Sequence, residues 1–135
     1  MHYIGIDIGG MSIKCGVVTE DGVLLGKQSV VTPTGDYILA VKAIAELCKK
    51  TAQAYNIAWE DIAAIGVGIP GTVHEGIVSF ASNLSWYGVP FDKALELEIQ
   101  KPVFSGNDAN CALLAEWRFG KGKGIGNVAM ITLGT

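Results

Sequence analysis

The sequence predicts an α/β domain built on a mixed sheet, and three observations support this fold class. Three strand-like segments come first, at residues 3–9, 12–19 and 23–31. Helical and strand-like segments then alternate from residue 37 onwards. Half of the 135 residues are hydrophobic and only 17% are charged, so the chain can bury a core. This order predicts a sheet that is antiparallel first and parallel later, with helices on its faces.

The turns of the N-terminal segment support a meander. The first strand runs into Gly9-Gly10, which is typical of a tight turn. Glu20-Asp21-Gly22 lies between the second and third strands and is a hairpin signal. The first three strands are therefore expected to be antiparallel.

The alternating region begins with a helix. Asp36 is a good N-cap for residues 37–56, where apolar side chains recur at spacings of three and four. The apolar, β-branched run at 62–69 predicts a buried strand. The remaining expected elements are a helix at 91–99, a strand at 102–106, a helix at 109–119, a loop at 120–126 and a strand at 127–133.

Charge and cysteine usage exclude several classes of protein. A net charge of −3 argues against a nucleic-acid or anionic-membrane partner, which would require a basic face. The three cysteines are odd in number and widely spaced, as is typical of core residues in a reducing compartment. No secretory signal and no apolar run of ~18 residues is present. We therefore expect a cytoplasmic protein.

GVGIPG at 66–71 matches the dinucleotide-binding pattern G-x-G-x-x-G. That pattern requires a helix to begin at its third glycine, so that the helix N-terminus faces the pyrophosphate. The residues that follow, TVHEGIVSF, are β-branched and interrupted by glycine, and Pro70 lacks an N–H donor. The dinucleotide interpretation is therefore rejected.

DIGGMSIK at 7–14 places two glycines between two strands. Consecutive glycine N–H groups can form a small anion-binding nest, here with the Ser12 hydroxyl and the Lys14 ammonium nearby. Asp7 would repel phosphate unless a divalent cation lay between them, which suggests Mg²⁺ held through water. Taken alone, the motif favours an ordinary Gly-Gly hairpin over a phosphate site.

SGNDAN at 105–110 gathers polar residues where a strand becomes a helix. One interpretation is helix capping, for which Asn and Asp are preferred. The other is a carboxylate at the C-terminal end of a strand, where α/β sheets bind ligands. Asn107 and Asp108 are the residues in question.

Taken together, the motifs resemble those of the ROK family of sugar kinases and sugar-responsive repressors, within the actin-like ATPase superfamily. The resemblance covers essentially the whole chain, and the family's bacterial glucokinases are the most similar. The matching segments, in order, are D-x-G-G at 7–10, GVGIPG at 66–71, N-L-x-W at 83–86, N-D-A-N at 107–110 and I-T-L-G-T at 131–135.

The resemblance implies an actin-like (ribonuclease H-like) lobe, residues 1–135, of a two-lobed kinase that binds ATP and a sugar between its lobes. The first phosphate loop would contain Asp7, Gly9, Gly10, Ser12 and Lys14. Gly134 and Thr135 would begin the second phosphate loop. The sugar side would comprise Gly71, Asn83 and Asn107, with Asp108 as the catalytic base. ATP and Mg²⁺ are the implied cofactors.

The chain departs from the family pattern at two places. Met11 stands where threonine commonly follows D-x-G-G, which puts ATP affinity in doubt. The family pattern continues beyond Thr135 with a second lobe and a Cys/His zinc motif, neither of which is in this chain. We expect the C-terminal lobe to be absent and the fragment alone to be inactive.

Several functions stay open at this stage. A repressor of the same family would carry a DNA-binding domain ahead of the first strand, where this sequence leaves no room. A β-glucoside or N-acetylhexosamine kinase is a further alternative, because the sequence does not identify the sugar. Whether a full-length parent is a homodimer is also open.

Overall fold

The computed structural model describes residues 1–133. Its main sheet has five strands in the order β3-β2-β1-β4-β8. These are β1 (His2–Ile8), β2 (Ser12–Thr19), β3 (Leu24–Val31), β4 (Ile62–Ile69) and β8 (Val103–Asn107). β1, β2 and β3 pair antiparallel, whereas β4 and β8 join β1 in parallel. The predicted mixed sheet is confirmed.

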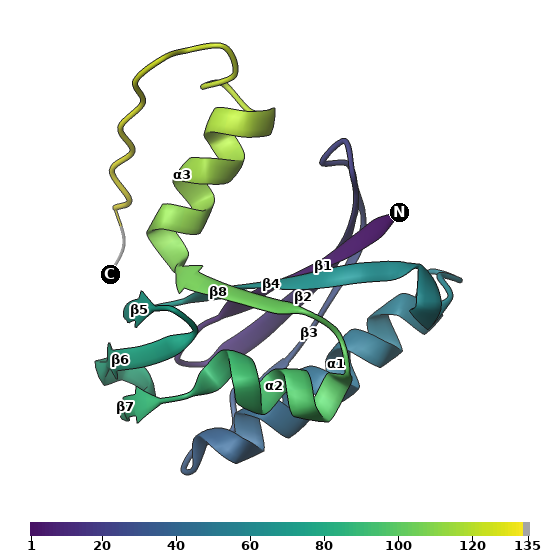
Figure 1. The fold of residues 1–135 in the computed structure, drawn as a ribbon, viewed down its shortest axis with the longest axis vertical. Coiled ribbons are helices and arrows are strands. Elements are labelled where there is room, and N and C mark those ends of the chain that lie inside the picture. Colours follow the sequence, from purple (N-terminus) through teal and green to yellow (C-terminus); the bar gives the residue numbers. More distant parts are fainter. Residues whose placement is uncertain (134–135) are drawn as a thin grey trace.

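Two helices cover one face of this sheet (Figure 1). They are α1 (Tyr37–Ala54) and α2 (Phe91–Ile99). The Asp36 side chain accepts a hydrogen bond from the Ile38 N–H at 3.0 Å, so the expected N-cap of α1 is confirmed. Both helices bury an apolar stripe against the sheet, and Ile44 and Phe91 are fully buried in it. The hydrophobic core lies between the sheet and these two helices.

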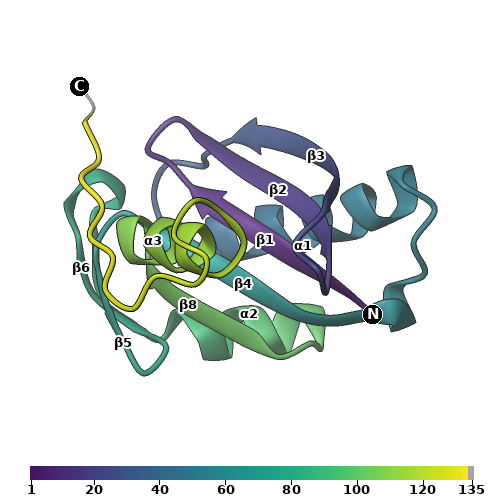
Figure 2. The ribbon, with the colours of Figure 1, turned by 90° about the horizontal axis from the view of Figure 1, so that it is seen from above.

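The third helix, α3 (Asp108–Phe119), follows β8 directly and lies on the opposite side of the sheet (Figure 1). It contacts β4 and β8 through its first turns, and none of its residues is buried. Seen from above, β1, β2 and β3 have no helix in front of them (Figure 2). One face of the main sheet is therefore covered by helices, and the other is largely open.

A second, three-stranded sheet was not predicted from the sequence. It consists of β5 (Thr72–His74), β6 (Ile77–Ala81) and β7 (Trp86–Val89), in the order β5-β6-β7 with antiparallel pairing. Short 3-10 turns at Trp59–Asp61 and Ser82–Leu84 precede β4 and β7. Val78 and Trp86 bury one side of this small sheet in the same core. In the sequence, the three strands of the small sheet lie between β4 and α2.

The prediction of a strand at 127–133 is wrong. These residues are irregular, following the turns of residues 120–124 beside α3 (Figure 1). A single β-branched segment needs a partner strand before it can form a ladder, so its preference alone does not make a strand. Within residues 1–133, none of the helices has the length and apolarity required to span a membrane.

Candidate functional site

The carboxyl ends of three parallel strands converge at one edge of the main sheet. β1, β4 and β8 are adjacent and run in the same direction, ending at Ile8, Ile69 and Asn107. In register, Asp7 is the partner of Gly68, and Gly68 is the partner of Gly106. Ligands bind at such an edge in open α/β sheets. The motifs at 7–14, 66–71 and 105–110 thus meet at one place.

The turn between β1 and β2 is fixed by hydrogen bonds. The Gly9 N–H donates to the Ser12 carbonyl at 2.9 Å, so it is not free to bind a phosphate. The buried Thr32 holds the same turn twice: its hydroxyl donates to the Gly9 carbonyl at 2.7 Å and its N–H donates to the Met11 carbonyl at 3.0 Å. Sequence reasoning missed Thr32, which follows β3 and is distant from the motif along the chain.

Asp7 and Lys14 face each other across β1 and β2. Their side chains form an ion pair at 3.3 Å and both are more than half exposed, at 55% and 64%. Such a pair contributes little to stability, and its charges are accessible to a ligand. Among residues 1–133, no group of three potential ligands could hold a metal by itself. One accessible carboxylate fits Mg²⁺, which is usually held by one or two carboxylates, water and substrate phosphates.

Asn83 lies next to the first glycine loop. It belongs to the short turn before β7, and a Cβ added at Gly10 would be 3.9 Å from the Asn83 Cβ. Ser85 ends this turn in the left-handed conformation, with φ of 56°. The structure therefore brings an expected sugar-side residue within reach of the expected phosphate loop.

Asn107 is held at both ends of its side-chain amide. Its oxygen accepts a hydrogen bond from the Asn110 N–H at 3.1 Å, which makes Asn107 the N-cap of α3. Its nitrogen donates to the Gly71 carbonyl at 2.9 Å. Gly71 itself packs so closely against Phe80 and Ala81 that a side chain would clash there. Asn107 thus links the start of α3 to the loop before β5.

Asp108 is the first residue of α3, not its cap. Its Oδ1 accepts a hydrogen bond from the Ala109 N–H at 2.8 Å, and its Oδ2 has no hydrogen-bond partner within residues 1–133. The Asp108 Cα lies 3.4 Å from where a Gly68 Cβ would stand, so Gly68 allows α3 to approach β4. The carboxylate lies at the helix N-terminus, where the macrodipole favours negative charge. Half of the carboxylate remains available to a ligand.

Cys111 lies one turn further along α3. Its Sγ is 3.2 Å from where a Gly106 Cβ would stand, so it faces the open side of β8. Partial burial and the negative charge of Asp108 raise the pKa of its thiol. Asp108 and Cys111 are three residues apart on α3, so their side chains lie on the same face of the helix.

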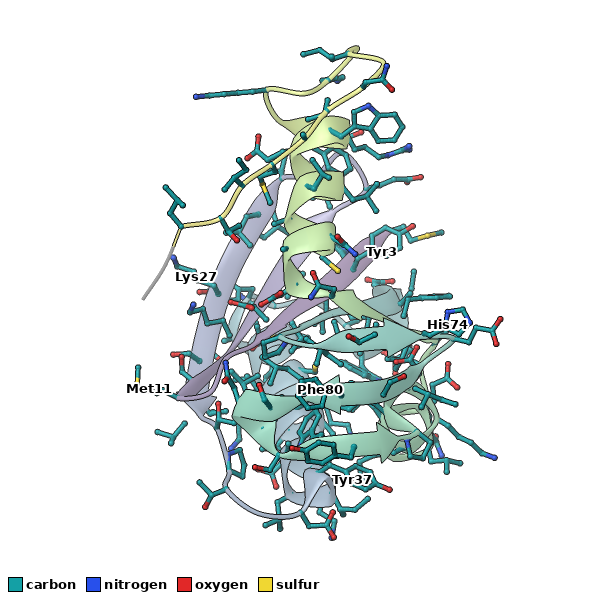
Figure 3. The ribbon with its side chains drawn as sticks, turned by 90° about the vertical axis from the view of Figure 1, so that its left-hand side faces the viewer. Tyr3, Met11, Lys27, Tyr37, His74 and Phe80 are labelled. Atoms are coloured by element: carbon teal, nitrogen blue, oxygen red, sulfur yellow. The ribbon has the colours of Figure 1, made fainter. Side chains whose placement is uncertain are left out.

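Two sequence-based expectations remain, which concern Met11 and the second phosphate loop. Met11 is 87% exposed and projects away from the sheet at the turn between β1 and β2 (Figure 3). Its thioether therefore does not pack inward. Gly134 and Thr135, the expected start of a second phosphate loop, lie outside the described residues.

Comparison with known proteins identifies the family. The ROK family profile matches residues 3–135. The chain belongs to the ROK family. It is 40% identical over 134 residues to a glucokinase of Streptomyces coelicolor, and it is 41% identical over 138 residues to a polyphosphate glucokinase of Mycobacterium leprae. These alignments cover 98% and 97% of this chain, respectively, and 40% of each relative.

The fold comparison agrees with the family. The crystal structure of a ROK family glucokinase from Streptomyces griseus, in complex with glucose and AMPPNP, superposes with a TM-score of 0.82 at 36% identity. The superposition covers 92% of this chain and 38% of that one. The ROK-family chain therefore has the actin-like ATPase fold expected from its sequence, and it spans about two fifths of the relatives' length.

Proposed function

We propose that this ROK-family chain is the N-terminal lobe of a two-lobed enzyme that transfers a phosphoryl group from ATP to a hexose. The observation that carries the proposal is that Asn107, and not Asp108, is the N-cap of α3. Asn107 caps α3, so Asp108 is not needed as the cap. Asp108 instead stands beside Gly68, which lies at the carboxyl edge of the sheet on the strand next to the one that carries Asp7.

In this proposal Asp108 is the general base. It accepts the proton of the sugar hydroxyl as that oxygen attacks the γ-phosphorus, while the bond from phosphorus to the bridging oxygen of ATP breaks and ADP leaves. Asn107 and Asn83 contribute polar groups on the sugar side, where Gly71 allows the loop before β5 to pack closely against Phe80 and Ala81. Because the Asn107 amide already holds Gly71 and α3, its role toward the sugar includes shaping this loop as well as direct contact.

The phosphate side is proposed to form around the first turn. Gly10, Ser12 and Lys14 would contact the phosphates, and Thr32 fixes the loop that presents them. Asp7 would hold Mg²⁺ through water, and the metal would neutralise charge on the transferring phosphoryl group. Since phosphoryl transfer depends on positioning and electrostatic stabilisation, one lobe alone is expected to turn over sugar very slowly.

The decisive experiment replaces Asp108 by Asn in a two-lobed enzyme that carries this chain as its N-terminal lobe. Asparagine keeps the shape but cannot accept the proton, and general-base catalysis contributes typically ~10²–10⁴-fold. We expect kcat with ATP and glucose to fall by that factor, and sugar affinity to fall far less. Steady-state kinetics and equilibrium sugar binding measure the two quantities.

The matched control is Asp36→Asn, which changes the N-cap of α1 far along the chain from the proposed site. Asparagine caps about as well as aspartate, so this variant should keep both kcat and melting temperature. An Asp108→Asn enzyme with normal turnover and an unchanged melting temperature would reduce Asp108 to a helix residue and remove the proposed mechanism.

A further inference from the structure

Within residues 1–133, β8 is an edge strand of the main sheet, and two of its backbone N–H groups donate hydrogen bonds to carboxylates of α2. The Val103 N–H donates to Glu96 Oε1 at 3.1 Å. The Ser105 N–H donates to Asp92 Oδ2 at 3.2 Å, and the Ser105 hydroxyl donates to Asp92 Oδ1. Hydrogen bonds to an ionised acceptor are about twice as strong as neutral ones. The edge strand is thus held by side chains where it lacks a neighbouring strand.

The spacing of the two carboxylates along α2 matches the spacing of the two N–H groups along β8. Asp92 and Glu96 are one helical turn apart, which is ~6 Å along α2. Val103 and Ser105 are two residues apart on β8, which is ~6.6 Å, and both N–H groups point away from β4. The pattern therefore fixes the position of β8 along the helix. Asp92 bonds Ser105, which lies two residues before Asn107 and therefore at the end of β8 nearer to the proposed site.

Asp92 also holds the hairpin on the sugar side. Its backbone N–H donates to the Gly76 carbonyl at 3.1 Å, just after β5. At the other end of β5, the Asn107 amide donates to the Gly71 carbonyl. Asp92 and Asn107 thus bracket β5, and both are connected to β8. A shift of Asp92 would be transmitted to the strand that presents Asn107 and Asp108 and to the loop at Gly71.

We propose that Asp92 is a positioning residue, which sets the placement of Asn107 and Asp108 by clamping Ser105 and the β5–β6 turn. The proposal rests on the kinase function given above. Asp92 does not touch the reacting atoms; it acts through β8. Glu96 forms a similar hydrogen bond to the start of the same strand, four residues before Asn107, and so provides a matched comparison.

The test compares Asp92→Ala with Glu96→Ala in the two-lobed enzyme, using ATP and glucose. Misplacement of a catalytic group by ~1 Å can cost ~10²-fold in rate. We expect Asp92→Ala to lower kcat by ~10- to 100-fold, and Glu96→Ala to lower the melting temperature similarly while keeping kcat near that of the unsubstituted enzyme. Asp92→Asn keeps an acceptor for the Ser105 N–H, so it should restore most of the lost kcat.

Two further variants keep the proposal testable if Asp92→Ala fails to fold. Ser105→Ala removes only the hydroxyl bond and should lower kcat partially. Combined with Asp92→Asn, it should show a loss that is not the sum of the two, as expected for directly bonded partners. Equal losses of kcat in the Asp92 and Glu96 variants, in proportion to lost stability, would overturn the positioning role. An inactive unsubstituted enzyme would instead refute the kinase function.

Discussion

The two faces of the main sheet are built from the same strands and differ in almost every other respect. On β1, Ile4, Ile6 and Ile8 face α1 and α2 and are buried. The residues between them, including Gly5 and Asp7, face the opposite side and are exposed. Strand alternation places each residue on one face, so each face has its own composition. The covered face is apolar and stabilising, whereas the open face carries few large side chains.

Glycine is the most conspicuous feature of the open face. Gly16, Gly5 and Gly66 are cross-strand partners and form a row across β2, β1 and β4. A Cβ added at Gly5 or Gly66 would meet nothing within 4 Å. Further toward the carboxyl edge, Gly68 lies against Asp108. The covered face therefore provides the buried core, whereas the open face has few large side chains and ends at the proposed site.

The largest expected difference is between alanine substitutions at two adjacent residues of β4 whose side chains face opposite sides of the sheet. Ile65→Ala removes a fully buried side chain and should cost ~2–5 kcal/mol of unfolding free energy. Gly66→Ala adds a methyl group in open space and should change stability by less than ~1 kcal/mol, since alanine also restricts the unfolded chain. Urea unfolding of the two variants measures both values.

An equal destabilisation by Gly66→Ala would mean that a segment packs closely on the open face in solution. That outcome would break the distinction between the two faces. Gly68→Ala offers an intermediate case, because its Cβ would stand 3.4 Å from the Asp108 Cα.

A smaller effect is expected at the carboxyl edge, where the two faces meet. Asn107→Ala removes the N-cap of α3, which typically costs ~1 kcal/mol, and also releases the Gly71 carbonyl. We expect lower stability in urea unfolding and weaker sugar binding in the two-lobed enzyme. Asn110→Ala is the control, because Asn110 uses its backbone N–H in the cap and keeps it after substitution. Equal losses in both variants would contradict the role of the Asn107 side chain.

The smallest expected effect is a difference in alkylation rate between the cysteines on the two faces of the sheet. Cys15 and Cys48 lie in the core under the covered face, 1% and 0% exposed. A hydrogen bond that the Cys48 thiol donates to Cys15, together with burial, raises the pKa of Cys48. Cys111 is exposed on the other side. Iodoacetamide should therefore modify Cys111 first in the folded 135-residue chain, as mass spectrometry can measure.

The same measurement reports on Asp108. Its negative charge disfavours the Cys111 thiolate and raises the thiol pKa. Asp108→Asn removes that charge, so the pKa should fall and alkylation at pH 8 should become faster. An unchanged rate would show that the carboxylate and the thiol are not close in solution. Asp36→Asn serves as the control, since it changes charge at the start of α1.

Much of the fold could be predicted from local patterns. The bounds of β2, β4 and α2 agree with the predicted segments at 12–19, 62–69 and 91–99. These segments have clear periodicity or continuous apolar character with turn signals beside them. The small sheet escaped prediction because its strands are three to five residues long and are stabilised by pairing between segments.

The sequence by itself determined that the motifs at 7–14, 66–71 and 105–110 meet at one edge of the sheet, because parallel strands bring their carboxyl ends together whatever the details of packing. It also determined the family, through motifs in a fixed order. The tertiary structure decided which of Asn107 and Asp108 caps α3, because both can do so chemically and only the path of the chain aligns one with the Asn110 N–H. The contacts of Thr32 and of the proposed positioning residue Asp92 likewise appear only in the tertiary structure. Their hydrogen-bond partners lie far from them in the sequence, and no local pattern records that proximity.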